Sequence, residues 1–153
     1  MLTWLKSLFG TPQPAGPPRT IRKFRVGDPT LTRVSIAQDA WSIDSGGNET
    51  IRLFEIENPD VEQCLLTYRG KMKADGLSGR AYFEMWCRFP GRGEFFSKGV
   101  NQPVSGTTEW TSNEIPFYLK KGERPDLIKL NVAVEGKGKV LVKDLELLAT
   151  PLR

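Results

Sequence analysis

Four side chains that could hold a ligand alternate along one short segment of the chain. Every second position of "AYFEMWCRF", residues 81–89, is taken by Tyr82, Glu84, Trp86 and Arg88. In a β-strand, residues at this spacing share one face. Aromatic rings stack on the C–H faces of a pyranose and charged groups hydrogen-bond to its hydroxyls, a combination typical of ligand sites. The spacing therefore predicts a sugar-binding surface on one face of a sheet.

The element that must position these groups is a predicted β-hairpin over residues 62–89. Its centre, "ADGL", contains Asp75-Gly76, a pair that suits a two-residue type I′ turn. With this pair as the loop, Tyr68 lies opposite Phe83, and small or apolar residues fill one face of both strands. The other face brings Arg69 beside the four residues above, because directly opposite side chains share a face. The predicted ligand-binding residues are Trp86, Tyr82, Arg69, Glu84 and Arg88.

A second interpretation of this face stays open. A loop or another layer of the fold could cover Tyr82 and Trp86, while the charged residues form exposed cross-strand pairs. We expect Glu84 to be a charge partner of Arg69 and Arg88 rather than a general acid. The accessibility of the two rings decides between these interpretations.

The same register places Cys64 directly opposite Cys87 on the core face. At about 5.5 Å between Cα atoms, a disulfide is within reach. Cross-strand bridges are strained, however, and no export signal points to an oxidising compartment. We therefore expect two packed thiols.

Short apolar runs separated by turns continue along the chain from about residue 31. The chain holds 15 Gly and 11 Pro, and no apolar run keeps a helical period over the length of a helix. Evenly spaced short strands of this kind are typical of a β-sandwich or barrel. The pattern predicts about eight to ten strands.

The net charge of +4 lies in the N-terminal segment. Residues 1–30 carry five basic groups and one acidic group, whereas the remainder is balanced. Together with "TPQPAGPP", this predicts a flexible, basic, Pro-rich tail at residues 1–25 and a folded domain at residues 26–153. Residues 1–10 could make an amphipathic membrane contact, although a frayed end is the preferred interpretation. A neutral domain lacks the basic groove that nucleic-acid binding requires.

Several chemistries are excluded by what the sequence lacks. It contains no His, the commonest general base and metal ligand. Two Cys cannot form a zinc site alone, and "PGRGE" is too short to cradle a phosphate. No signal peptide or membrane span is readable, so the compartment is unknown and cytoplasmic by default. We predict that the protein is not an enzyme.

A family pattern can be recognised in the C-terminal half. Its elements are "SGTTEW" at residues 105–110, a Pro-containing loop, and "LNVAVEGKGKVLVKDLEL" at residues 130–147. These resemble the last third of galactose-binding-like jelly-roll domains, which include carbohydrate-binding modules. The segment "AYFEMWCRFPGRGEFFSKGV" also looks like uncharacterised bacterial members of this group. The resemblance implies an all-β antiparallel sandwich of the jelly-roll type.

Two local expectations belong to this segment. The apolar alternation shifts by one residue near Lys143-Asp144, which predicts a β-bulge. Trp110 follows a turn cluster and is expected to plug the edge of the core.

The resemblance also bears on metal binding. Many carbohydrate-binding jelly rolls carry a structural calcium, and one ligand is an Asp in the last strand, which Asp144 matches. Calcium takes roughly six to eight oxygen ligands, and no second ligand can be named. Lys143 and Leu141 stand where related domains often have acids and an aromatic residue. Apart from this possible calcium, no cofactor is predicted.

The sequence thus leads to two functional hypotheses. The first is a noncatalytic binding module whose sheet face holds a carbohydrate or glycan-like ligand. The alternative is a structural or protein-interaction domain tethered through its N-terminal tail. The oligomeric state is left open.

Overall fold

The computed structural model describes residues 12–153, and these residues form eleven β-strands without a helix. All strand pairs are antiparallel, which confirms the predicted all-β class with one strand more than the upper estimate. The strands are β1 (Arg19–Lys23), β2 (Ser35–Ala37), β3 (Ala40–Gly46), β4 (Glu49–Glu57), β5 (Cys64–Asp75), β6 (Leu77–Phe89), β7 (Gly93–Lys98), β8 (Val104–Gly106), β9 (Thr111–Leu119), β10 (Leu127–Glu135) and β11 (Lys137–Pro151).

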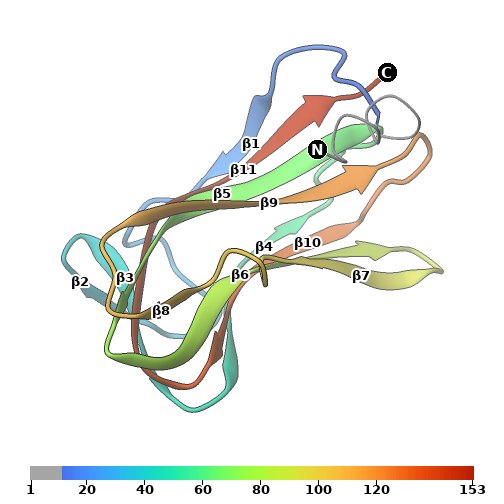
Figure 1. The fold of residues 1–153 in the computed structure, drawn as a ribbon. Coiled ribbons are helices and arrows are strands. Elements are labelled where there is room, and N and C mark those ends of the chain that lie inside the picture. The colour runs from blue at the N-terminus through green and yellow to red at the C-terminus, as the bar shows by residue number, and fades with distance from the viewer. Residues whose placement is uncertain (1–11) are drawn as a thin grey trace.

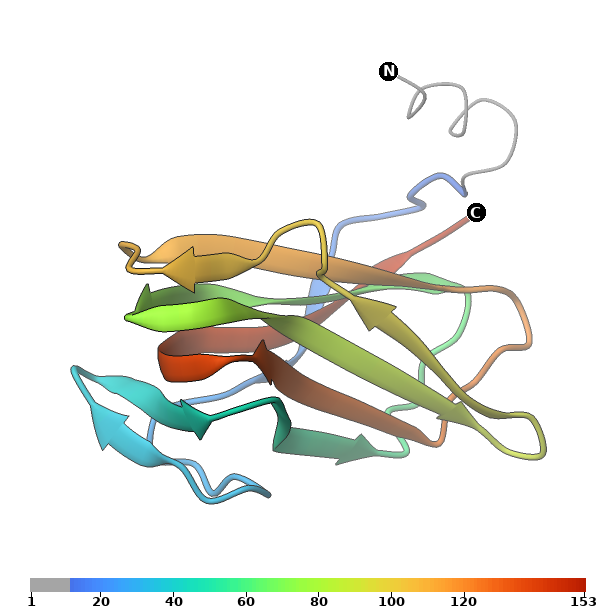
Figure 2. The ribbon, with the colours of Figure 1, turned by 60° about the horizontal axis from the view of Figure 1, so that its bottom comes forward.

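The strands form two sheets that pack face to face (Figures 1 and 2). The six-stranded sheet has the order β2-β3-β11-β5-β9, with β1 also paired to β11. The five-stranded sheet has the order β4-β10-β6-β7, with β8 also paired to β6. Each sheet therefore has one face in the core and one outer face, as in other β-sandwiches.

The predicted hairpin at Asp75-Gly76 is wrong, because β5 and β6 belong to different sheets. The chain crosses the sandwich at Gly76, whose φ is +61°. It crosses again at Gly136, between β10 and β11. As a result, β5 pairs with β11 and β6 pairs with β10, and the two strands do not pair with each other.

Glycine permits these two crossings to nest against each other. A Cβ atom on Gly79 would overlap the carbonyl oxygen of Glu135, and one on Gly136 would lie 2.6 Å from the Gly79 nitrogen. A Cβ atom on Gly138 would lie 2.5 Å from the Gly76 carbonyl oxygen. Because the two backbones touch here, the crossings form one compact corner that joins the sheets.

The core faces of β5 and β6 are nevertheless the predicted ones. Alternate residues of both strands are buried, from Cys64 to Ala74 and from Ala81 to Cys87. Tyr68 and Phe83 are in contact, with ring centroids 4.7 Å apart. They meet across the interior between two sheets rather than as neighbours in one sheet. Burying an aromatic side chain of this size stabilises a fold by about 1.5–3 kcal/mol.

Both cysteines are free and buried, as expected. Burial raises the pKa of the Cys64 thiol to about 11. Burial also raises the pKa of Cys87 to about 12, with a smaller contribution from the neighbouring Cys64. The thiols are therefore packed as small apolar groups.

The predicted tail at residues 1–25 is wrong over its second half. β1 pairs with β11, Phe24 is buried, and Pro14 forms a bridge with Leu152. The apolar residues Ile21 and Phe24 pack on the core. The proline and basic residues around them hid this apolar side in the sequence. The predicted membrane contact at residues 1–10 lies outside the described residues. Within residues 12–153, no helix is long and apolar enough to cross a membrane.

The predicted bulge is present in β11. The register with β5 shifts between Lys143 and Glu146, and Asp144 has a φ of +54°. The shift lets Leu145 and Leu147 continue the buried side of the strand. It also brings Glu146 opposite Arg69 on the outer face.

Candidate functional site

The five predicted ligand residues lie on opposite sides of the molecule. Tyr82, Glu84, Trp86 and Arg88 are on the outer face of the five-stranded sheet, which includes β6. Arg69 is on the outer face of the six-stranded sheet, which includes β5. The site that was predicted around all five residues therefore does not exist as one surface, because the corner at Gly76 sends its two strands to different sheets.

On the five-stranded sheet, Trp86 forms an aromatic pair with Phe96 of β7. Their ring centroids are 5.2 Å apart. Trp86 is half-buried, whereas Phe96 is 56% exposed. The Lys98 ammonium lies 4.7 Å from the Phe96 ring centroid, a cation–π arrangement.

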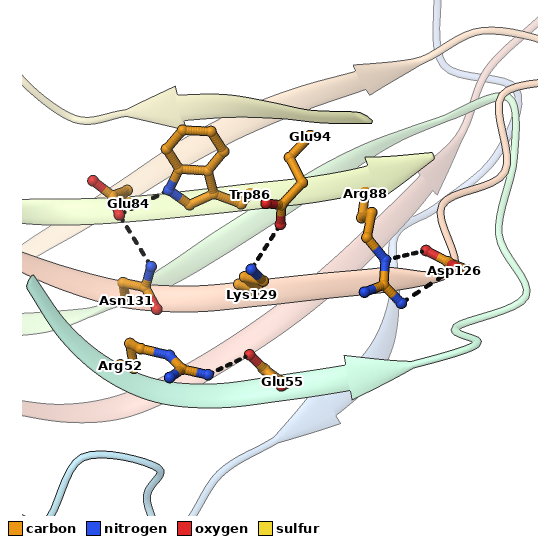
Figure 3. Close-up of polar contacts among 9 residues, drawn as sticks. All are labelled: Arg52, Glu55, Glu84, Trp86, Arg88, Glu94, Asp126, Lys129 and Asn131. Carbon is orange, nitrogen blue, oxygen red and sulfur yellow. Dashed lines mark hydrogen bonds and ion pairs between the residues drawn. The ribbon is translucent and has the colours of Figure 1, made fainter. Parts of the chain in front are cut away.

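Buried polar groups beneath these rings bond to one another (Figure 3). The Glu84 Oε1 atom accepts hydrogen bonds from Trp86 Nε1 at 2.9 Å and from Asn131 Nδ2 at 3.0 Å. Lys98 lies 3.7 Å from the other oxygen of Glu84. Glu84 and Asn131 are both buried although they point away from the core. These contacts support a structural role for Glu84 rather than contact with a ligand. Its charge partner is Lys98, whereas the predicted partners Arg69 and Arg88 bind Glu146 and Asp126.

Tyr82 is also sealed within this face. It is 5% exposed, and its hydroxyl donates a hydrogen bond of 2.7 Å to Glu135, which also binds Arg80. Desolvation, followed by the bond to Glu135, raises the pKa of Tyr82 to about 12. A ring with so little exposed area cannot offer a stacking platform for a sugar.

The charged residues around Trp86 form ion pairs, as the alternative interpretation expected. Figure 3 shows Arg88 bound to Asp126, Lys129 to Glu94 and Arg52 to Glu55. The hydrogen bond from Arg88 lowers the pKa of Asp126. Arg88, which was predicted to contact a ligand, is therefore bound to Asp126, the loop residue just before β10. The nitrogen–oxygen distances in these ion pairs are 2.9 Å for Arg88 Nε–Asp126 Oδ1, 2.7 Å for Lys129 Nζ–Glu94 Oε1 and 3.0 Å for Arg52 Nη2–Glu55 Oε2.

Arg69 lies in a hollow of about 500 Å³ on the opposite side of the molecule. The hollow crosses β9, β5 and β11, and the loop before β8 adds one residue. Its wall is polar and contains no aromatic side chain. The lining residues are Arg69, Gly70, Lys71, Gln102, Ser112, Asn113, Glu114, Asp144 and Glu146.

Arg69 is held in this hollow by Glu146. Arg69 Nε and Nη2 both donate to the Oε1 atom of Glu146, at 3.2 and 3.0 Å. The second oxygen of Glu146 and the remaining N–H groups of Arg69 are left for other partners. Glu114 lies directly opposite Arg69 on β9, on the same outer face. Asn113 lies opposite Gly70 on the core-facing side of β9, where its buried Nδ2 atom has no hydrogen-bond partner among the described residues. The hollow thus combines an oriented guanidinium with polar groups that a ligand could satisfy.

Two aromatic residues lie beyond the hollow along β9. Trp110 immediately precedes the strand, and its ring centroid lies 4.2 Å from Lys143 Nζ and 5.9 Å from Lys73 Nζ. Trp110 is half-buried and lies beside these outer-face lysines, so the prediction that it plugs the core edge is wrong. Tyr118, on the outer face opposite Leu65, is 45% exposed. The two residues are separated by eight positions, or about 26 Å of extended chain.

The residues around Asp144 do not fit calcium. Asp144 itself is exposed, and its carboxylate lies 3.8 Å from Lys71 Nζ. Among residues 12–153 there is no group of three acids, cysteines or histidines that could hold a metal ion. Calcium needs several oxygen ligands, whereas the group beside the Asp144 carboxylate is the ammonium of Lys71.

Sequence reasoning missed the partners that β5 and β6 acquire from distant strands. Glu146 of β11 hydrogen-bonds to Arg69, and Glu114 of β9 lies opposite Arg69. Asn131 of β10 hydrogen-bonds to Glu84. Their strands were predicted, but their order in the sheets was not. The exposed Phe96 had a signal in "EFFSKGV", although two adjacent phenylalanines do not reveal which one points outward.

Comparisons with known proteins support the fold. No family model matches the sequence, and no curated protein matches it. Among solved structures, the xylan-binding CBM22-1 domain of Paenibacillus barcinonensis Xyn10C superposes with a TM-score of 0.54 at 10% identity, covering 90% of this chain and 98% of that one. A CBM4 structure gives 0.49 at 14% identity (84% and 85% covered), and TmCBM61 in complex with β-1,4-galactotriose gives 0.43 at 16% identity (86% and 88% covered).

The fold likeness rests on the first of these three structures. At 10% identity it establishes a shared architecture. The described residues form a jelly-roll β-sandwich like that of a carbohydrate-binding module, which confirms the predicted fold. The ligand has to be argued from the surfaces of this chain, since one scaffold supports many functions.

Proposed function

We propose that this protein is a noncatalytic carbohydrate-binding domain that holds a saccharide along the outer face of its six-stranded sheet. The observation that carries the proposal is the polar hollow around Arg69, with Trp110 and Tyr118 along the same strand on either side of it. The likeness in fold to a xylan-binding domain supports the proposal. Concave sites with a few convergent polar groups are the common form of a ligand pocket.

In this proposal, Arg69 is the central ligand contact. Glu146 fixes the guanidinium by two hydrogen bonds to one oxygen, so the free N–H groups are oriented before a ligand arrives. Preorganised donors bind more strongly because less conformational entropy is lost. Ser112 and Glu114 supply further donors and acceptors for sugar hydroxyls on the same face.

The ligand that fits this surface is a neutral polysaccharide. In the hollow itself, the two cations Arg69 and Lys71 are outnumbered by three acids in the lining, so the hollow offers no excess of positive charge to a polyanion. The distance between Trp110 and Tyr118, about 26 Å along the strand, suits several linked sugar rings rather than a single one. Each ring would provide a stacking surface at one end of the chain.

Catalysis is not part of the proposal. Glycoside hydrolysis usually needs two carboxyl groups that face each other across the bond, one as an acid and one as a base or nucleophile. Here Glu146 is bound to Arg69, and Asp144 is paired with Lys71.

The proposal is tested by affinity electrophoresis and calorimetry with soluble xylan, mixed-linkage β-glucan and β-1,4-galactan. We expect the wild type to bind at least one of them, and Arg69→Ala to weaken binding by tenfold or more. A hydrogen bond to a charged group contributes about 1.5–3 kcal/mol, and 1.4 kcal/mol is tenfold in affinity. Trp86→Ala, on the opposite face, is the matched control and should bind like the wild type.

Two results would count against this assignment. If Trp86→Ala loses binding and Arg69→Ala keeps it, the ligand lies on the five-stranded sheet, where the sequence predicted Trp86, Tyr82, Glu84 and Arg88 as contacts. If the wild type binds none of the three polysaccharides, the carbohydrate proposal fails for plant cell-wall glycans.

The predicted tether role of the N-terminal segment stays a prediction, since residues 1–11 lie outside the described chain.

A further inference from the structure

The outer edge of β7 is unpaired in the part of the chain that the structure describes. There, β7 ends the order of the five-stranded sheet and pairs with β6 alone. Within residues 12–153, no backbone hydrogen bond reaches its other side. Figure 1 shows the strand at the margin of its sheet. Open strand edges of this kind present N–H and C=O groups that can pair with another strand.

The pairing with β6 determines which backbone groups face outward. Glu84 lies opposite Lys98 in the register, so Phe83 lies opposite Gly99 one step further. The Gly99 amide donates to the Phe83 carbonyl at 2.9 Å, which makes this a hydrogen-bonded pair. Such pairs alternate along an antiparallel ladder. The backbone groups of Glu94, Phe96 and Lys98 therefore point away from β6.

Glu94, Phe96 and Lys98 of one copy are complementary in charge and backbone pattern to the same three residues of a second copy. If two copies of β7 pair antiparallel around Phe96, Glu94 of each copy lies opposite Lys98 of the other. The outward backbone groups of the same three residues then face each other, so no shift of register is needed. Opposite charges directly across a ladder stabilise it, and like charges destabilise it. A two-fold axis through Phe96 satisfies both the backbone and the charge pattern.

The exposed side chains of β7 also favour a partner. Phe95 and Phe96 are 46% and 56% exposed, on opposite faces of one strand. On the two-fold axis, Phe96 would meet its own copy beside Trp86, whose ring is already in contact with it. Glu94 and Lys98 lie near Lys129 and Glu84 but are still about one-third exposed. Their charged groups therefore have room for a second partner.

We propose that two copies of this chain associate through β7, so that their five-stranded sheets join into one continuous sheet across a two-fold axis. The interface contains Glu94, Phe96 and Lys98 from each copy. The proposal is independent of the saccharide groove, which lies on the other sheet and stays accessible in each copy. A contact along one short strand buries a small area, so the dimer is expected to be weak and concentration-dependent.

The test is sedimentation equilibrium of the full chain over a series of concentrations from micromolar to millimolar. We expect the wild type to dimerise, and Glu94→Lys or Lys98→Glu alone to weaken dimerisation by about tenfold or more, because each places like charges opposite each other twice. Mixing the two variants should restore dimers, since every Lys then faces a Glu. This recovery also shows that both variants are folded. Glu49→Lys, an exposed change at the start of β4, is the matched control and should dimerise like the wild type.

A second variant tests the backbone contact. Phe96→Pro removes an outward N–H group but no hydrogen bond to β6, and proline is tolerated at such positions of edge strands. We expect this variant to be monomeric with an unchanged far-ultraviolet circular dichroism spectrum. The proposal is overturned if the wild type is monomeric at every concentration. It is also overturned if the wild type dimerises and the mixture of charge variants dimerises no better than either variant alone.

Discussion

The two outer faces of this sandwich use similar residues in different ways. On the five-stranded sheet, Glu84, Asn131 and Tyr82 are buried and bonded within the protein. On the six-stranded sheet, Arg69 lies in a hollow and its partner Glu146 keeps one carboxylate oxygen free. The polar groups of the first face form hydrogen bonds between the strands of their own sheet. The second keeps them available, which is why we assign the ligand to it.

The difference shows that a residue's place within a strand does not determine its role. Arg69 and Arg88 both point outward, and both bind a carboxylate from another element. Arg88 makes bonds to both oxygens of Asp126, so that partner is occupied. Arg69 uses one oxygen of Glu146 and leaves the other free. The surrounding hollow, rather than the residue type, separates a candidate ligand contact from a structural ion pair.

The largest effect is expected at the corner that separates the two faces. Gly79→Ala should lower the free energy of unfolding by about 3 kcal/mol or more, because the new methyl group would overlap the Glu135 carbonyl oxygen. Urea denaturation measures this change. Gly47→Ala, where no atom lies within 4 Å of the added Cβ, is the control and should change stability little. A variant as stable as the wild type would mean that the two crossings do not touch.

An intermediate effect separates the roles of the faces. Asn131→Ala leaves the buried Glu84 with one hydrogen bond fewer and should cost about 1–3 kcal/mol of stability without changing saccharide affinity. Glu114→Ala in the hollow should weaken saccharide binding and leave the urea midpoint nearly unchanged, because its side chain is exposed. The comparison would be broken by the opposite pattern, with affinity lost in Asn131→Ala and stability lost in Glu114→Ala.

A smaller effect depends on pH. The folded-state pKa of Tyr82 is raised from 10.0 to about 12 by burial and by its bond to Glu135. The protonated phenol is therefore favoured in the folded state, and its contribution to stability is present below pH 10. This contribution falls as the pH rises from 10 towards 12, by at most about 1.4 kcal/mol per pH unit. Unfolding of the wild type and Tyr82→Phe should differ progressively over this interval, and a constant difference would show that Tyr82 is not sealed.

The sequence was sufficient for features that depend on neighbouring residues in one strand. Alternation identified the buried sides of β5 and β6, and a shift in phase located the bulge at Asp144. Both follow from the two-residue period of a strand, which holds whichever strand lies alongside. The packed thiols follow from the same alternation.

Features that depend on strand order could not be predicted in this way. Asp75-Gly76 suits a hairpin, but the contact of Gly79 with Glu135 and Gly136 makes it a crossing between sheets. Nothing within residues 62–89 contains that information, because the deciding contact is with a segment more than fifty residues away. For the same reason the sequence combined Arg69 with Trp86, although the fold separates them.

The most direct test of the account uses the indole N–H signals of Trp110 and Trp86 in a two-dimensional NMR titration with the polysaccharide fragment that binds best. Trp110→Phe and Trp86→Phe assign the two signals. Because the proposed groove includes Trp110 and lies on the far side of the sandwich from Trp86, we predict that the Trp110 signal moves with saturating ligand while the Trp86 signal does not. Movement of the Trp86 signal with an unmoved Trp110 signal would contradict the account.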